Sequence, residues 1–178
     1  MITLSKKVCL LGDAEVGKSS LVRRFIYDLF EDRHLSNNGT SEVKVSVKVV
    51  AVPRDDAMIE LTIALWDLAD SVSFERVRTS YLRGTAGAVA VGDITRPATI
   101  ADLYRYSRDL RASNPEAHLV LAFNKTDLTD QRAVTDTQIE TVAQDINAPY
   151  YLTSGRTGEN VDLLFRHLGR LLVTDVAA

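Results

Sequence analysis

The chain has 178 residues, of which 25% are charged and 46% hydrophobic, and its formal net charge is −3. This length predicts one domain covering residues 1–178, and the slight acidity without a sustained basic run argues against nucleic acid as a partner. No apolar stretch reaches the roughly 18 residues that span a bilayer. Cys9 is the only cysteine, so an internal disulfide is excluded. We therefore expect a monomeric cytoplasmic protein in which Cys9 is buried and unreactive.

Hydrophobic patterning predicts strands and helices that alternate along most of the chain. The patterns of strands occupy residues 7–11, 43–49, 60–66, 86–91, 118–123 and 150–152. Helical spacing follows Lys18 and recurs over residues 100–110, 137–146 and 161–173. Residues 53–56 predict a turn that makes strands 43–49 and 60–66 a hairpin. This order predicts an α/β fold, with a mainly parallel sheet and helices on both of its faces.

The most informative segment is residues 12–19, which fit the pattern G-x-x-x-x-G-K-[ST] between a predicted strand and a predicted helix. The two glycines allow a tight loop whose N–H groups face a phosphate, and the helix adds the positive end of its dipole. Lys18 can reach the β and γ phosphates, and the Ser19 hydroxyl can coordinate Mg²⁺. The predicted phosphate-binding residues are Asp13, Ala14, Glu15, Val16, Gly17, Lys18, Ser19 and Ser20.

A second motif, N-K-x-D at residues 124–127, follows a predicted strand. The Asp127 carboxylate can accept two hydrogen bonds from the N1–H and the amine of guanine, and adenine would leave it unpaired. Lys125 can lay its stem along the base, and Asn124 can tie this loop to the phosphate loop. Residues 153–156 follow the last short strand, and the predicted contacts to the base there come from Ser154, Gly155 and Arg156.

Three segments then resemble a known family. Residues 66–71 resemble W-D-T-A-G-Q, residues 80–84 resemble S-Y-Y-R-G, and residues 153–161 resemble T-S-A-K-T-G-E-N-V. On these motifs the chain resembles the small GTPases of the Ras superfamily, and the Rab branch in particular, with degenerate switch regions. The resemblance implies a P-loop NTPase fold with a six-stranded, mainly parallel sheet, one antiparallel strand and five helices. It also implies binding of GDP and GTP with Mg²⁺.

The same resemblance implies several roles. Asp67 would hold Mg²⁺ through water, and Phe30 would pack edge-on against the guanine, although a phenylalanine there also suits a core. Switch loops near residues 31–41 and 67–80 would bind effector and regulator proteins. The C-terminal residues contain neither a cysteine for a prenyl group nor a polybasic stretch, so no direct lipid anchor is expected.

The chain departs from the family pattern at three positions. The switch threonine that contacts Mg²⁺ falls on Asn37, and Thr40 would replace it in another register. The glycine whose N–H senses the γ-phosphate falls on Asp70, where a carboxylate near a phosphate is unfavourable unless it points away or meets a cation. The glutamine that orients water falls on Ser71, which is too short for that task. The candidate catalytic residues are therefore Lys18, Asp70 and Ser71, and Arg33 and Arg76 are candidates for compensating cations.

Two functions follow from these residues. The first is a guanine-nucleotide-binding switch that hydrolyses GTP slowly, with help from a partner. The second is a catalytically impaired, GTPase-like binding or scaffold module that uses the nucleotide as a structural ligand. An ATP-using P-loop enzyme is disfavoured by Asp127.

Overall fold

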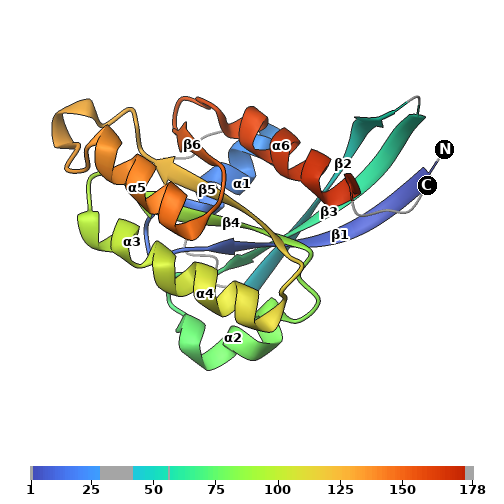
Figure 1. Ribbon diagram of the computed structural model, residues 1–178, viewed down its shortest axis with the longest axis horizontal. Coiled ribbons are helices and arrows are strands. Elements are labelled where there is room, and N and C mark those ends of the chain that lie inside the picture. Colours follow the sequence, from blue (N-terminus) through green and yellow to red (C-terminus); the bar gives the residue numbers. More distant parts are fainter. Residues whose placement is uncertain (1, 29–41, 56, 175–178) are drawn as a thin grey trace.

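The structure, a computed structural model, describes residues 2–28, 42–55 and 57–174. Its centre is a six-stranded sheet with the spatial order β2-β3-β1-β4-β5-β6 (Figure 1). The strands are β1 (Ile2–Leu11), β2 (Val43–Arg54), β3 (Ala57–Leu68), β4 (Gly87–Asp93), β5 (His118–Asn124) and β6 (Tyr150–Thr153). Only β2 runs antiparallel to its neighbour, and the other pairs are parallel. The predicted α/β sheet, with its hairpin and its one antiparallel strand, is confirmed.

Helices cover both faces of this sheet, as predicted. Helices α1 (Lys18–Tyr27) and α6 (Val161–Thr174) pack on one face, and α2 (Phe74–Leu82), α3 (Pro97–Ala101), α4 (Leu103–Ser113) and α5 (Asp136–Ile146) contribute to the core of the other. A short 3-10 helix, η1 (Thr129–Gln131), follows β5. Side chains alternate along β4, so Val89 and Val91 join the first core while Ala88 and Ala90 join the second. Strand β4 is therefore buried on both faces, whereas Val45, Val47 and Val49 of the edge strand β2 are exposed.

The helices differ from expectation in two ways, so the described residues contain six α-helices where the resemblance implied five. The helix expected over residues 100–110 begins earlier, because Pro97 suits the first position of a helix, and it is divided at Asp102 into α3 and α4. Helix α2 was missed by periodicity because it buries only three side chains, those of Phe74, Tyr81 and Leu82. Its apolar stripe is too short to stand out from the charged residues between them.

Strand direction determines where the loops meet. Strands β1, β3, β4, β5 and β6 run in parallel, so their carboxyl ends lie at one edge of the sheet. The segments that follow these strands begin at residues 12, 69, 94, 125 and 154. Doubly wound sheets bind ligands at this edge. No helix within residues 2–28, 42–55 and 57–174 is both long and apolar enough to cross a bilayer.

The single cysteine lies inside the core, as the sequence predicted. Cys9 has no exposed surface, and its Sγ atom lies 3.1 Å from Thr85 Oγ1 and 3.4 Å from the Tyr81 carbonyl oxygen. Burial raises the pKa of the Cys9 thiol to about 11, against a smaller opposing effect of the Thr85 hydrogen bond. Because the thiolate is the reactive form, the folded protein holds Cys9 in its inert form.

We predict that a thiol reagent at pH 8 labels Cys9 at least ~100-fold more slowly in the native protein than in urea, since both exposure and ionisation are suppressed. Labelling is counted by mass spectrometry, and the single cysteine makes each added mass unambiguous. Complete labelling of the native protein within minutes would contradict this burial.

Candidate functional site

The candidate site begins at the loop between β1 and α1. Gly12 and Gly17 have φ angles of 140° and 104°, which residues other than glycine rarely adopt. A Cβ atom at Gly12 would lie 2.4 Å from the Val91 carbonyl oxygen, so the loop also needs glycine for its close approach to β4. Helix α1 then begins at Lys18, with its first N–H groups directed toward this edge of the sheet.

Lys18 is the central cation of this loop. Its side chain is only 6% exposed, and its Nζ atom donates to the carbonyl oxygens of Gly12 at 3.1 Å and of Asp13 at 2.7 Å. The third contact of Nζ is the Asp70 carboxylate, 3.2 Å away. The other oxygen of Asp70 accepts the Glu15 backbone N–H at 3.0 Å. The Asp70 carboxylate therefore meets the Lys18 ammonium. A nearby cation was one of the two conditions under which we expected a carboxylate to be tolerated at this position.

The motif at residues 124–127 lies beside this loop. Asn124 is 2% exposed, and its Nδ2 donates to the Val16 carbonyl oxygen at 2.9 Å, so the predicted tie between the two loops is present. Its Oδ1 accepts the Thr153 hydroxyl at 3.0 Å and the Gly155 N–H at 3.3 Å. A Cβ atom at Gly17 would lie 2.2 Å from Asn124 Nδ2, so this tie depends on glycine at residue 17.

Lys125 makes a second connection to the phosphate loop. Its Nζ atom donates to the Glu15 carbonyl oxygen at 2.7 Å and lies 2.8 Å from Asp93 Oδ2. The side chain therefore reaches across the edge of the sheet from β5 toward the loop after β1. Its backbone has a positive φ of 74°, which is uncommon for a residue other than glycine.

The third part of the site follows β6. The Ser154 hydroxyl donates to Asp127 Oδ1 at 2.6 Å, and the Thr126 N–H donates to the Thr153 carbonyl oxygen at 3.1 Å. These bonds orient the half-buried Asp127 side chain next to the Gly155 backbone. The exposed Arg156 contributes its carbonyl oxygen to a hydrogen bond from Arg24 of α1.

The half-buried Ser19 and the buried Asp67 form a polar pair beside Lys18. The Ser19 hydroxyl donates to Asp67 Oδ2, and Asp67 Oδ1 is buried without a partner among the described residues. Burial raises the pKa of Asp67, although the hydrogen bond from Ser19 and the charge of Lys18 oppose this effect. A hydroxyl oxygen beside an unpaired carboxylate oxygen is a donor set that suits a hard divalent cation.

Sequence reasoning missed a second buried carboxylate at this edge. Asp93, at the end of β4, is 1% exposed and pairs with Lys125 and with Arg96, whose Nε lies 3.2 Å away. Burial opposes ionisation of Asp93, but the hydrogen bonds from Lys125 and Thr95 outweigh it and lower the pKa. Arg96 also donates to the Ala14 carbonyl oxygen at 2.8 Å. Only the sheet register, which sets Asp93 opposite Asn124, brings these residues together.

A further network connects the phosphate loop with α2. Tyr106 of α4 donates its hydroxyl proton to Asp13 Oδ1 at 2.9 Å, and Arg105 Nη2 lies 3.7 Å from the same oxygen. Arg105 also pairs with Glu75 in the first turn of α2. The sequence did not indicate a role for Arg105 or Tyr106 at this site. Each is typical of the surface or the core of a helix.

The remaining predicted residues are not brought to the loop. Ser71 follows Asp70 in an exposed turn, and the exposed Arg76 pairs with Glu42 at 2.5 Å. The predictions that fall on Phe30, Arg33, Asn37 and Thr40 lie outside the described residues.

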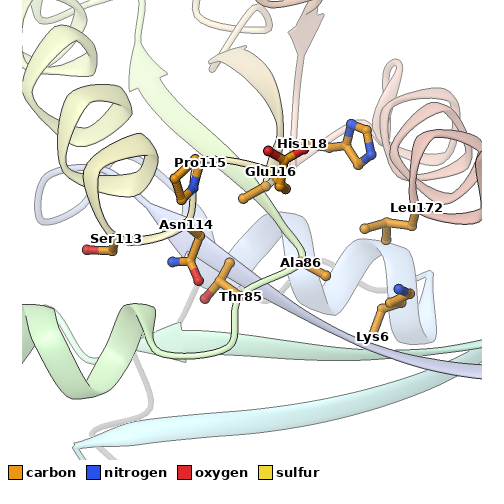
Figure 2. Close-up of a pocket in the computed structure, with 10 residues that line it drawn as sticks. Lys6, Thr85, Ala86, Ser113, Asn114, Pro115, Glu116, His118 and Leu172 are labelled. Atoms are coloured by element: carbon orange, nitrogen blue, oxygen red, sulfur yellow. The ribbon is translucent and has the colours of Figure 1, made fainter. Parts of the chain in front are cut away.

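A pocket at the opposite edge of the sheet contains none of the residues of this candidate site. It has a volume of about 370 Å³ and lies where β4 and β5 begin, at the opposite ends of these strands (Figure 2). Figure 2 shows Thr85, Asn114 and Pro115 on one side of it, and Lys6 and Leu172 on another. None of the predicted phosphate, base or metal residues lines it.

The Asn124 side chain should contribute to stability even without a ligand. We predict that Asn124→Ala lowers the free energy of unfolding by about 2–4 kcal/mol, because it removes a hydrogen bond from each of three buried partners, the Val16 carbonyl oxygen, the Thr153 hydroxyl and the Gly155 N–H. Urea denaturation measures this. Asn114→Ala is the matched control, since Asn114 is half-buried and donates one bond, to the Leu82 carbonyl oxygen; we expect it to lose about 1 kcal/mol. Equal losses in the two variants would contradict the special role of Asn124.

Comparison with known proteins agrees with this geometry. The model of the Ras family matches residues 7–174. GTP-binding protein ypt5 of Schizosaccharomyces pombe is 32% identical over 97% of this chain and 80% of its own length. Ras-related protein Rab-22A of Mus musculus is 36% identical over 92% and 81%, and Ras-related protein RABF2b of Arabidopsis thaliana is 34% identical over 96% and 82%. The chain therefore belongs to the Ras family of GTP-binding switch proteins, and within it to the Rab branch.

Proposed function

We propose that residues 1–178 form one G domain, which binds GDP and GTP at the edge described above and works as a molecular switch that hydrolyses GTP slowly. One observation carries this proposal: Asn124 and Lys125 of the base motif both bond to carbonyl oxygens of the phosphate loop. The two motifs are thereby held as one site, at a separation fixed by the fold. A nucleotide has the same two-ended chemistry, with a base at one end and phosphates at the other.

The phosphates would lie over residues 13–20. The backbone N–H groups from Asp13 to Ser20 and the start of α1 supply donors and a positive dipole. Lys18 supplies the charge for the β and γ phosphates. Its ammonium contacts oxygen atoms of the protein, so phosphate oxygens would exchange with protein oxygens rather than enter an apolar pocket.

The guanine would lie between the loops after β5 and β6. Asp127 would accept the N1–H and the amine, a backbone N–H of residues 153–156 would donate to O6, and the Lys125 stem would cover one ring face. The Ser154 hydroxyl supports this role of Asp127, because it fixes one carboxylate oxygen and leaves the other for the base. Arg156 and, outside the described residues, Phe30 complete the proposed base contacts.

The donor set beside Lys18 fits Mg²⁺. Ser19 would give its hydroxyl oxygen, and Asp67 would act through water, for which its unpaired buried oxygen is the supporting observation. Either Asn37 or Thr40 would add a ligand from outside the described residues. Such an ion would neutralise charge on the phosphates during transfer.

Hydrolysis is the slow step in this proposal, because the usual glutamine is replaced by the exposed Ser71 and the usual glycine by Asp70. A partner protein would supply the missing group. Effectors and regulators would bind through the loops near residues 31–41 and 67–80, and the protein would act as a monomer in the cytoplasm. The scaffold module remains the second candidate, favoured by the same two substitutions.

Hydrolysis separates these two functions. We predict that the wild-type protein loaded with GTP and Mg²⁺ converts bound GTP to GDP over hours, whereas Lys18→Ala does not retain nucleotide, because it loses the only buried cation of the loop. Chromatography of the bound nucleotide measures both. GTP that stays intact on the wild-type protein for a day would favour the scaffold module.

Selectivity tests the base contact. We predict that Asp127→Asn weakens GTP binding by at least about 100-fold and strengthens binding of xanthosine triphosphate, because an amide donates where the carboxylate accepted. Competition against a fluorescent guanine nucleotide measures both affinities. Asp130→Asn, an exposed change three residues further on, is the control and should alter neither. Unchanged selectivity in Asp127→Asn would remove Asp127 from the base site.

A further inference from the structure

Asp70 makes an unusual pair of contacts for a residue in the segment after β3. Its Oδ2 accepts the Glu15 backbone N–H at 3.0 Å, and its Oδ1 lies 3.2 Å from Lys18 Nζ. Both oxygens of one carboxylate are therefore held by the phosphate loop. The sequence separation is large: Asp70 lies 55 positions after Glu15 and 52 positions after Lys18.

The two donors are those that a phosphate loop directs at phosphate. Loops of this pattern surround phosphates with backbone N–H groups and bring the lysine to the β and γ positions. An anionic group with two oxygens that takes one such N–H and this lysine has the charge and the acceptor geometry of a phosphate. The carboxylate is thus placed where a bound nucleotide would put phosphate oxygens.

The fold positions Asp70 for this contact. Asp67, three residues earlier, is held by Ser19 of α1, and the Ala69 N–H donates to the Glu42 carbonyl oxygen at 3.0 Å. The backbone of Asp70 does not adopt a positive φ, so no glycine-like conformation is needed at this position. The turn continues through a hydrogen bond from the Val72 N–H to the Ala69 carbonyl oxygen at 2.9 Å.

We propose that the Asp70 carboxylate stands in for the terminal phosphate of the nucleotide and makes this site prefer GDP over GTP. The inference rests on the proposed nucleotide site. GTP brings an additional phosphate to Lys18, so Asp70 must leave before the triphosphate can bind. GDP lacks that phosphate, and Asp70 keeps its bond to Lys18 beside the diphosphate.

The contact is exchangeable rather than permanent. The Asp70 side chain is 42% exposed, whereas that of Lys18 is 6% exposed. Asp70 can therefore move into solvent without leaving a buried charge behind, and the incoming phosphate takes over Lys18. The segment near residues 67–80 then has two positions, one in contact with the loop and one displaced from it.

The test compares the affinities of GDP and a non-hydrolysable GTP analogue, GTPγS, for the full chain with Mg²⁺. Competition against a fluorescent GDP gives both dissociation constants. We expect the wild-type protein to bind GDP at least tenfold more tightly than GTPγS. Asp70→Asn removes the charge and keeps the shape, and Asp70→Gly removes both; each should reduce this preference at least tenfold, mainly by strengthening GTPγS binding.

Glu42→Gln is the matched control. It removes one negative charge beside the same segment, where Glu42 pairs with Arg76 and not with the phosphate loop. Its preference for GDP should equal that of the wild type. Raising the NaCl concentration should narrow the difference in this preference between the wild type and Asp70→Asn, because salt screens the repulsion between the Asp70 carboxylate and the additional phosphate.

Three outcomes overturn the inference. Unchanged affinities for both nucleotides in both Asp70 variants would show that the carboxylate does not compete with the terminal phosphate. An equal gain for GDP and GTPγS would show that it does not discriminate between them. Failure of the wild-type protein to bind either nucleotide would instead overturn the proposed function, and this inference with it.

Discussion

The site depends on the buried amide of Asn124, which connects three loops through both of its polar atoms. Parallel strands bring the loops to one edge, but strand direction alone leaves their separation free. An amide that is 2% exposed must satisfy both its donor and its acceptor, so the loops after β1, β5 and β6 are held at one spacing. Gly17 makes this possible, because any side chain there would occupy the place of the Asn124 amide.

A buried lysine imposes the next constraint. An ammonium group that is 6% exposed needs acceptors, and Lys18 finds them in two carbonyl oxygens of its own loop and in Asp70. Asp70 replaces the glycine of the family pattern, and its carboxylate supplies an acceptor to Lys18, the cation of that pattern's phosphate loop. The loss of the glycine is compatible with the switch as well as with the scaffold function, because the proposed exchange of the Asp70 carboxylate would give the segment after β3 two positions.

The surrounding network extends this coupling to α2. Asp13 of the phosphate loop accepts from Tyr106, Arg105 lies near the same oxygen, and Arg105 pairs with Glu75 at the start of α2. Burial raises the pKa of Asp13, while the hydrogen bond from Tyr106 and the charge of Arg105 favour its ionised form. Helix α2 follows the segment after β3 and is connected to the phosphate loop through Glu75 and Arg105. A displacement of that segment would therefore change the contacts of α2.

The sequence alone determined the α/β order, the hairpin, the phosphate and base motifs and the positions at which the family pattern fails. These follow from local periodicity and from motifs in which neighbouring residues act together, such as Lys18 with Ser19 or Asn124 with Asp127. Helix α2 was not evident, because its three buried side chains give too weak a periodic signal, and the division at Asp102 left no sign in the sequence pattern. Only the tertiary structure decided the contacts of Asp70 with Lys18, of Asp93 with Lys125 and of Arg105 with Asp13, since the two residues of each pair lie far apart in the sequence. Such contacts depend on sheet register and helix packing, which act between segments and leave no pattern within any one of them.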